Sequence, residues 1–197
     1  MANTYAGEVA IAWQGRDYLF RPTLAAIGSL GTPRGIVDIL RRAQKPTMDG
    51  YVAALAVLSA CYVGDPDDIN RLIGHFREVK GQLRYVLGSV PAQNVHVIGA
   101  RLAVAGIVGD PKPRKGDGNS TREFDPAEFV GAAQAHLGMS SAEAWQMTMI
   151  EFQRAMDAKF PDPKAQKEKD LPTKGAAAAS VAHVIQLRDR IRSRHSN

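Results

Sequence analysis

Residues near the N-terminus alternate in hydrophobicity, whereas most of the remaining chain has helical spacing. Residues 8–13 alternate and are rich in strand formers, and residues 18–20 resume an apolar strand pattern. Between them, residues 14–17 (Gln-Gly-Arg-Asp) have the composition of a tight turn. The pattern therefore predicts an N-terminal β-hairpin.

Two long apolar, alanine-rich runs lie at residues 51–63 and 95–108, and each is followed by Gly-Asp-Pro. A glycine in this place is typical of a helix C-terminus, and Asp-Pro begins the next element. The runs predict two buried helices of one bundle. Between them, four apolar residues suggest a further helix, namely Ile69, Leu72, Ile73 and Phe76. Gly81, Gly88 and Pro91 interrupt the segment that follows.

Residues near the front of the chain predict two shorter helical elements. Pro22 permits a helical turn through Leu24 and Ile27. Thr32 and Pro33 form an N-cap with proline at the first helical position, and the helix that they begin ends in the basic pair 41–42.

Residues 124–161 predict a C-terminal unit of three helices. Its first helix begins at Asp125-Pro126 and ends before Gly138. Two capping boxes mark the starts of the other two helices, and they consist of Ser140 with Glu143 and Thr148 with Glu151. Pro161 prevents continuation of the last helix.

These patterns divide the chain into four parts. Residues 1–109 form the hairpin and helical bundle, residues 110–123 a polar linker loop, residues 124–161 the helical unit, and residues 162–197 a basic, flexible tail. Within the tail, residues 176–192 can form an amphipathic helix that carries Val184, Leu187 and Ile191 on one face. The predicted fold class is mainly α.

Composition supports a helical fold without a membrane span. The chain has 197 residues, of which 45% are hydrophobic and 7% aromatic, and it is rich in alanine. Its single cysteine, Cys61, cannot form an internal disulfide, and no run reaches the roughly 20 apolar residues of a membrane helix. We also find no signal peptide, so the expected compartment is the cytoplasm.

Charge distribution argues against a specific DNA reader. The net charge is +5, but residues 125–160 contain five acids and two bases, a net of −3, and residues 162–197 contain eight bases and four acids, a net of +4. A helix-turn-helix unit needs a basic recognition helix to neutralise phosphates. A protein-binding helical unit fits the charge better, and only weak, sequence-indifferent DNA binding is expected from the tail.

No sequence pattern supports catalytic, metal-binding or cofactor-binding residues. Asp65, Asp67 and Asp68 lack the later ligands of a calcium loop and are better explained as the start of a helix. The five histidines lack the spacing of a zinc helix, and there is no nucleophile elbow or phosphate-binding loop. We therefore expect a non-enzymatic protein without cofactors.

Large, adaptable apolar side chains in the helical unit and tail are the candidate partner-binding residues. They are Trp145, Met147, Met149, Phe152, Met156, Val184, Leu187 and Ile191. The alternative for those in the helical unit is that they only form its small core.

Two stretches resemble proteins of bacteriophage tail modules. Residues 133–161, AQAHLGMSSAEAWQMTMIEFQRAMDAKFP, resemble the C-terminal signature of tail assembly chaperones of long-tailed phages. Residues 18–40, YLFRPTLAAIGSLGTPRGIVDIL, resemble a family of uncharacterised phage tail-module proteins. Together the two stretches cover about a quarter of the chain, and neither contains a catalytic signature.

This resemblance implies a chaperone that binds the tape-measure protein in the host cytoplasm and assists polymerisation of the tail tube protein. Such a chaperone is absent from the mature virion. Two alternatives stay open, a structural tail or connector subunit of the virion and a nucleic-acid-binding regulator that uses the helical unit and basic tail. Self-association also stays open.

Overall fold

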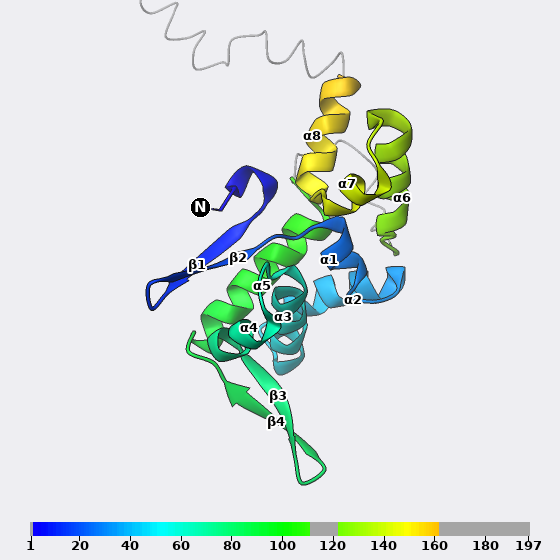
Figure 1. Ribbon diagram of the computed structural model, residues 1–197. Helices are drawn as coiled ribbons and strands as arrows, with labels where there is room; N and C mark the ends of the chain where they lie inside the picture. The colour runs from blue at the N-terminus through cyan, green and yellow to red at the C-terminus, as the bar shows by residue number, and fades with distance from the viewer. Residues whose placement is uncertain (1, 111–121, 162–197) are drawn as a thin grey trace, which may run out of the picture. The chain divides into compact units, whose positions relative to one another are not determined.

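The protein is mainly α-helical, as predicted, and its described residues include two separate β-hairpins. The computed structural model describes residues 2–110 and 122–161 (Figure 1). A short 3-10 helix, η1 (Thr4–Ala6), precedes the first hairpin. Most of the predicted linker and the whole of the predicted tail, including the tail helix, lie outside the described residues.

The first hairpin consists of β1 (Val9–Trp13) and β2 (Arg16–Phe20), which pair in antiparallel register from Val9 with Phe20 to Trp13 with Arg16. Gln14 and Gly15 form its two-residue turn, with φ of 49° and 74°. Positive φ at both positions matches the right-handed twist of the strands, as in type I′ turns. This predicted hairpin is confirmed.

Two helices follow, and each is capped by a threonine, of which only Thr32 was predicted as a cap. Thr23 caps α1 (Leu24–Gly28), and Thr32 caps α2 (Pro33–Ala43), which has proline in its first turn and two arginines in its last. Each threonine hydroxyl accepts a hydrogen bond from the backbone N–H three residues later.

The two long apolar runs form α3 (Met48–Cys61) and α5 (Ala92–Ile107), which pack closely against each other. Gly99 makes this approach feasible, because a Cβ atom at that position would lie 2.5 Å from the Ala54 carbonyl oxygen. The prediction of a buried helix pair is confirmed.

The segment between the long helices differs from the prediction. Helix α4 (Pro66–Ile73) ends at Ile73, and a second hairpin follows, formed by β3 (Gly74–Val79) and β4 (Gln82–Leu87). The predicted continuation of the helix to Phe76 is therefore wrong. Gly74, at φ 87°, ends the helix, and Lys80 and Gly81, at φ 53° and 72°, make another type I′-like turn.

The C-terminal unit has the predicted helix starts and one feature that was not predicted. It contains α6 (Pro126–Ala132), the π-helical turn η2 (Ala133–Leu137), α7 (Ser141–Gln146) and α8 (Met149–Lys159). Gly138 ends the first helix at φ 68°, as expected, but the last turn before it is π-helical.

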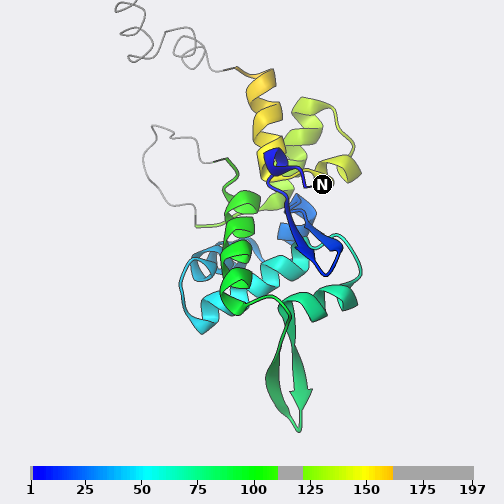
Figure 2. The same ribbon diagram turned by 90° about the vertical axis from the view of Figure 1, so that its left-hand side faces the viewer.

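A continuous hydrophobic core joins this unit to the hairpin and helices before it. The core includes Phe20, Leu58 and Leu102 together with Val130 and Met149. Helix α1 contacts both α6 and α7, and it lies beside them in both ribbon views (Figures 1 and 2). The helical unit is thus packed on α1 through side chains of the common core.

Candidate partner-binding site

Both predicted capping boxes hold the helical unit in shape. The Ser140 hydroxyl accepts from the Glu143 N–H at 3.3 Å, and the Ser140 N–H donates to the Glu143 carboxylate at 2.9 Å. Hydrogen bonds from the Ser140 hydroxyl and backbone lower the pKa of Glu143. Thr148 and Glu151 make the same reciprocal bonds at 3.2 and 2.8 Å. The starts of α7 and α8 are therefore fixed by local chemistry.

Arg21 connects the first hairpin to the helical unit. Its guanidinium donates to the Glu8 carboxylate at 2.9 Å and to both oxygens of the Glu151 carboxylate at 3.0 Å. Glu8 is buried and also accepts from the Asn3 N–H at 2.7 Å. Planar guanidinium groups suit such forked contacts. One arginine thus bridges two carboxylates that are far apart in the sequence.

Backbone contacts dock the segment between α7 and α8 onto the start of α1. The Leu24 N–H donates to the Met147 carbonyl at 2.8 Å, and Thr23 and Thr148 form an antiparallel bridge. The Trp145 ring lies against Gly28, where a Cβ atom would be 3.5 Å from the ring. Contacts with α1 and with its capping residue Thr23 therefore fix the positions of Met147 and Trp145.

The structure places the five predicted partner-binding residues of the helical unit at different depths. Met149 and Phe152 lie in the core, with 2% and 8% of their surface exposed. The Phe152 ring packs edge-on against Phe129 at 5.4 Å between centroids. Neither residue is accessible to a partner in this conformation, because a buried side chain must move before it can meet one.

Trp145, Met147 and Met156 pack against the core and remain partly exposed. Their contact with a partner stays a prediction, now restricted to the exposed part of the predicted set. Val184, Leu187 and Ile191 lie outside the described residues.

Sequence reasoning missed other exposed apolar side chains. Met48 and Leu87 are each 73% exposed, and Val97 is also exposed. A helical or strand pattern does not reveal such exposure, because it depends on which neighbouring elements cover the residue.

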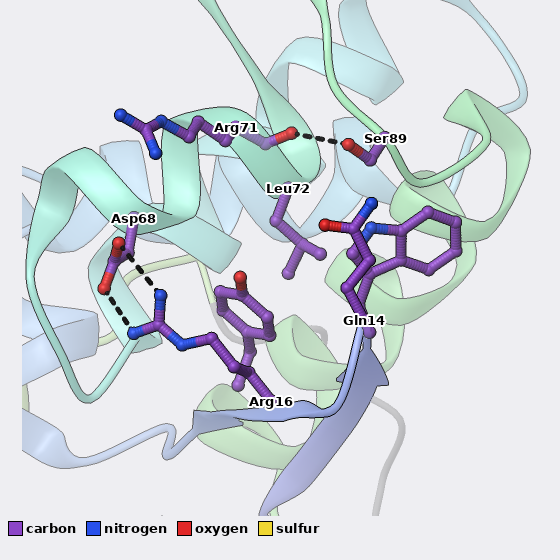
Figure 3. A pocket seen from close by; sticks show the side chains of 8 residues that line it. Gln14, Arg16, Asp68, Arg71, Leu72 and Ser89 are labelled. Carbon is purple, nitrogen blue, oxygen red and sulfur yellow. Dashed lines mark hydrogen bonds and ion pairs between the residues drawn. The ribbon is translucent and has the colours of Figure 1, made fainter.

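A small cavity lies between the turn of the first hairpin and α4. Its volume is about 150 Å³, and it is lined by Trp13, Gln14, Arg16, Tyr18, Asp68, Arg71, Leu72 and Ser89 (Figure 3). Arg16 lies at one side of the cavity, where its guanidinium donates two hydrogen bonds to the Asp68 carboxylate, at 2.9 and 3.4 Å. Pockets that bind drug-sized ligands measure about 300–1,000 Å³, so this cavity admits only a small group.

Two buried side-chain nitrogens have no hydrogen-bond partner within the described residues, Trp13 Nε1 beside this cavity and His75 Nδ1 in β3. The cavity could not be predicted from a local sequence pattern, because residues that line it, such as Arg16 and Asp68, are about 50 positions apart in the chain.

The acidic cluster at residues 65–68 has the structural role that was predicted. Asp65 caps α4 by accepting from the Asp67 N–H at 3.0 Å, while Asp68 pairs with Arg16. In the part of the chain that the structure describes, no group of histidine, cysteine and acidic residues could hold a metal ion. Burial raises the pKa of the Cys61 thiol to about 12, which keeps it protonated and poorly nucleophilic at neutral pH.

Comparison with protein families gives a match over most of the described residues. A family of unknown function, DUF6246, matches residues 42–172, about two thirds of the chain. The chain belongs to this family. The DUF6246 match spans α3, the second hairpin, α5 and the helical unit, and begins after the first hairpin.

No curated protein and no solved structure gives a significant match. Among the helices of residues 2–110 and 122–161, none has the length and hydropathy needed to cross a bilayer.

Proposed function

We propose that this DUF6246 protein is a non-enzymatic tail assembly chaperone of a long-tailed bacteriophage. It binds the tape-measure protein in the host cytoplasm, assists polymerisation of the tail tube protein around it, and does not enter the mature virion. The proposal starts from the resemblance of residues 18–40 and 133–161 to phage tail-module proteins.

The observation that carries the proposal is the contact between these two stretches. They are separated by more than 90 residues, yet Arg21 binds Glu151 and the Leu24 N–H binds the Met147 carbonyl. Residues of both stretches therefore belong to one structural unit. A resemblance that falls on two such stretches is easier to explain by one common fold than by two unrelated likenesses.

The side chains on this unit suit the proposed partner. A tape-measure protein is a long amphipathic chain whose exposed apolar stripes aggregate. Methionine and aromatic side chains can cover such stripes without demanding one sequence, because methionine has several rotatable bonds and a polarisable sulfur. Trp145, Met147 and Met156 expose part of this kind of surface beside the buried Met149 and Phe152.

The test is co-expression of the full chain with the tape-measure protein encoded in the same tail gene cluster, followed by pull-down. Met147→Asp and Met156→Asp should each reduce the recovered tape-measure protein at least about tenfold, since a carboxylate must then be desolvated at the contact. Circular dichroism should show an unchanged helical content.

Met48→Asp is the matched control, because it introduces the same change at a methionine that is 73% exposed on α3. It should leave the pull-down unchanged. If both helical-unit variants fold and still retain the tape-measure protein, the assigned surface is wrong. Failure of the wild type to retain it would contradict the chaperone function itself.

A further inference from the structure

The β3–β4 hairpin carries two arginines in an arrangement that does not favour the hairpin's own stability. Arg77 in β3 lies directly opposite Arg84 in β4, and both side chains are exposed. Like charges directly opposite each other destabilise an antiparallel pair. Within the described residues, neither arginine forms an ion pair that would offset this repulsion.

The arginines share the face of the hairpin that is turned away from α3. Phe76 and Tyr85 are opposite each other on the other face, where Tyr85 bonds to the Tyr51 hydroxyl and the Ile73 carbonyl. Because side chains alternate along a strand, Arg77 and Arg84 lie on the outer face. Glu78, the only acid in the hairpin sequence, alternates to the inner face and cannot neutralise them.

Among residues 2–110 and 122–161, no packing contact or ion pair requires this pair of charges. The hairpin lies between the C-terminal end of α4 and the N-terminal end of α5. Its turn points away from the helices in both views (Figures 1 and 2). In natural proteins, residues that break a local rule without a compensating contact occur most often at functional sites. A bound anionic partner would offset the repulsion between Arg77 and Arg84.

We infer that the outer face of the β3–β4 hairpin binds an acidic, amphipathic segment of a protein partner. Charge complementarity with Arg77 and Arg84 identifies the acidic character of that segment. Val86 is exposed and Val79 is partly exposed on the same face of the hairpin as the arginines. The partner segment should therefore also present apolar side chains, which would contact these valines. A phosphate backbone offers no apolar surface to these valines, so a protein segment fits better than nucleic acid.

A second copy of this face is not the occupant, because two arginine pairs would repel each other. The inference also stands apart from the proposed chaperone function. It concerns a different surface from α7 and α8, and substitutions in one surface leave the other unchanged.

The probe is a synthetic helical peptide with leucine at heptad positions a and d and glutamate at the exposed positions. Two further probes are a peptide with lysine in place of every glutamate and a short DNA duplex. Binding of each labelled probe to the full chain is measured by fluorescence anisotropy over a range of salt concentrations. The wild type should bind the glutamate peptide about tenfold or more tightly than the lysine peptide, with an affinity that falls as salt rises.

Arg77→Glu gives the sharpest test, because it places a carboxylate opposite Arg84. This change should weaken binding of the glutamate peptide about tenfold or more, while the melting temperature stays the same or rises through the new cross-strand ion pair. A residue with only a structural role would not lose binding and keep or gain stability. The double variant R77E/R84E should prefer the lysine peptide.

Arg101→Glu is the matched control, since Arg101 is an exposed arginine on α5 with no ion pair among the described residues. It changes the net charge equally and should leave peptide binding nearly unchanged. Three outcomes overturn the inference: equal losses from Arg101→Glu and Arg77→Glu, absence of binding by the wild type, or tighter binding to the DNA duplex that depends on Arg77 and Arg84.

Discussion

The two β-hairpins have nearly the same topology and the same kind of turn, yet their surroundings differ. In the first hairpin, Phe20 is fully buried, and the segment that follows is anchored by Arg21 to Glu8 and Glu151. In the second, Phe76 is 44% exposed and the arginines face solvent. Strand pairing alone therefore does not determine what a hairpin contributes to the fold, because two isolated strands are only marginally stable in water.

The largest expected difference comes from truncating the phenylalanine in each hairpin. Phe20→Ala should lower the free energy of unfolding by about 3–5 kcal/mol, because it leaves a cavity in the core. Phe76→Ala should cost only about 0.5–1 kcal/mol, mainly through its ring contact with Tyr85. Urea denaturation of both variants measures the contrast. Similar losses would show that the second hairpin is as much a part of the core as the first.

A smaller effect is expected from removing the ionic link next to the first hairpin. Arg21→Ala should cost about 2–3 kcal/mol, since it leaves the buried Glu8 carboxylate without its charged partner. The control is Arg34→Ala, whose pair with Glu123 is exposed and 3.9 Å long, so its loss should be within about 0.5 kcal/mol. The measurement is again the midpoint of urea unfolding. If the two losses are equal, Arg21 does not anchor the hairpin segment.

The smallest expected effect concerns the inner face of the second hairpin, where Tyr85 bonds to Tyr51 and Ile73. Tyr85→Phe should cost about 1 kcal/mol. Burial, followed by the hydrogen bond to Tyr51, raises the pKa of Tyr85 above its usual value of 10.0. The unfolded chain therefore ionises first, and the stability that Tyr85 provides is present below pH 10 and is lost as the pH rises toward the folded-state pKa.

Unfolding midpoints measured from neutral to alkaline pH should fall less steeply in Tyr85→Phe than in the wild type. Some decline should remain, because the raised pKa of Cys61 acts in the same direction. Identical alkaline slopes for the variant and the wild type would contradict the proposed role of Tyr85.

Local signals explain which parts of this fold could be predicted. The capping boxes of α7 and α8 and the turn at Gln14 and Gly15 each lie within four residues of sequence. The capping boxes were predicted correctly, and the predicted turn over residues 14–17 contains the observed one, although Arg16 and Asp17 belong to β2. The long helices α3 and α5 were also predicted, because few other elements bury such continuous apolar runs.

The second hairpin escaped prediction because neither of its faces is fully buried. The order of residues in β3 therefore does not alternate between apolar and polar, while Ile69, Leu72, Ile73 and Phe76 happen to continue a helical spacing. Gly81 was interpreted as a break, although with Lys80 it forms the turn.

The candidate sites depended even more on distant contacts. Met149 and Phe152 carry the same kind of side chain as the partly exposed Met147 and Trp145, and only tertiary packing in the common core, which includes the contact of Phe152 with Phe129 of α6, distinguishes the buried pair from the accessible one. The role of Arg21 was also missed, since its two carboxylate partners lie 13 and 130 positions away.

The separation of 130 positions between Arg21 and Glu151 also determines how long Arg21 waits for its partner during synthesis. Ribosomes add about 5–20 residues per second, so Arg21 leaves the ribosome roughly 7–26 s before Glu151 does. Throughout that interval the nascent hairpin and α1 lack the helices that later cover them. Docking of α6, α7 and α8 is thus a late step, and the growing chain passes through a state whose α1 surface is open to solvent and to other proteins.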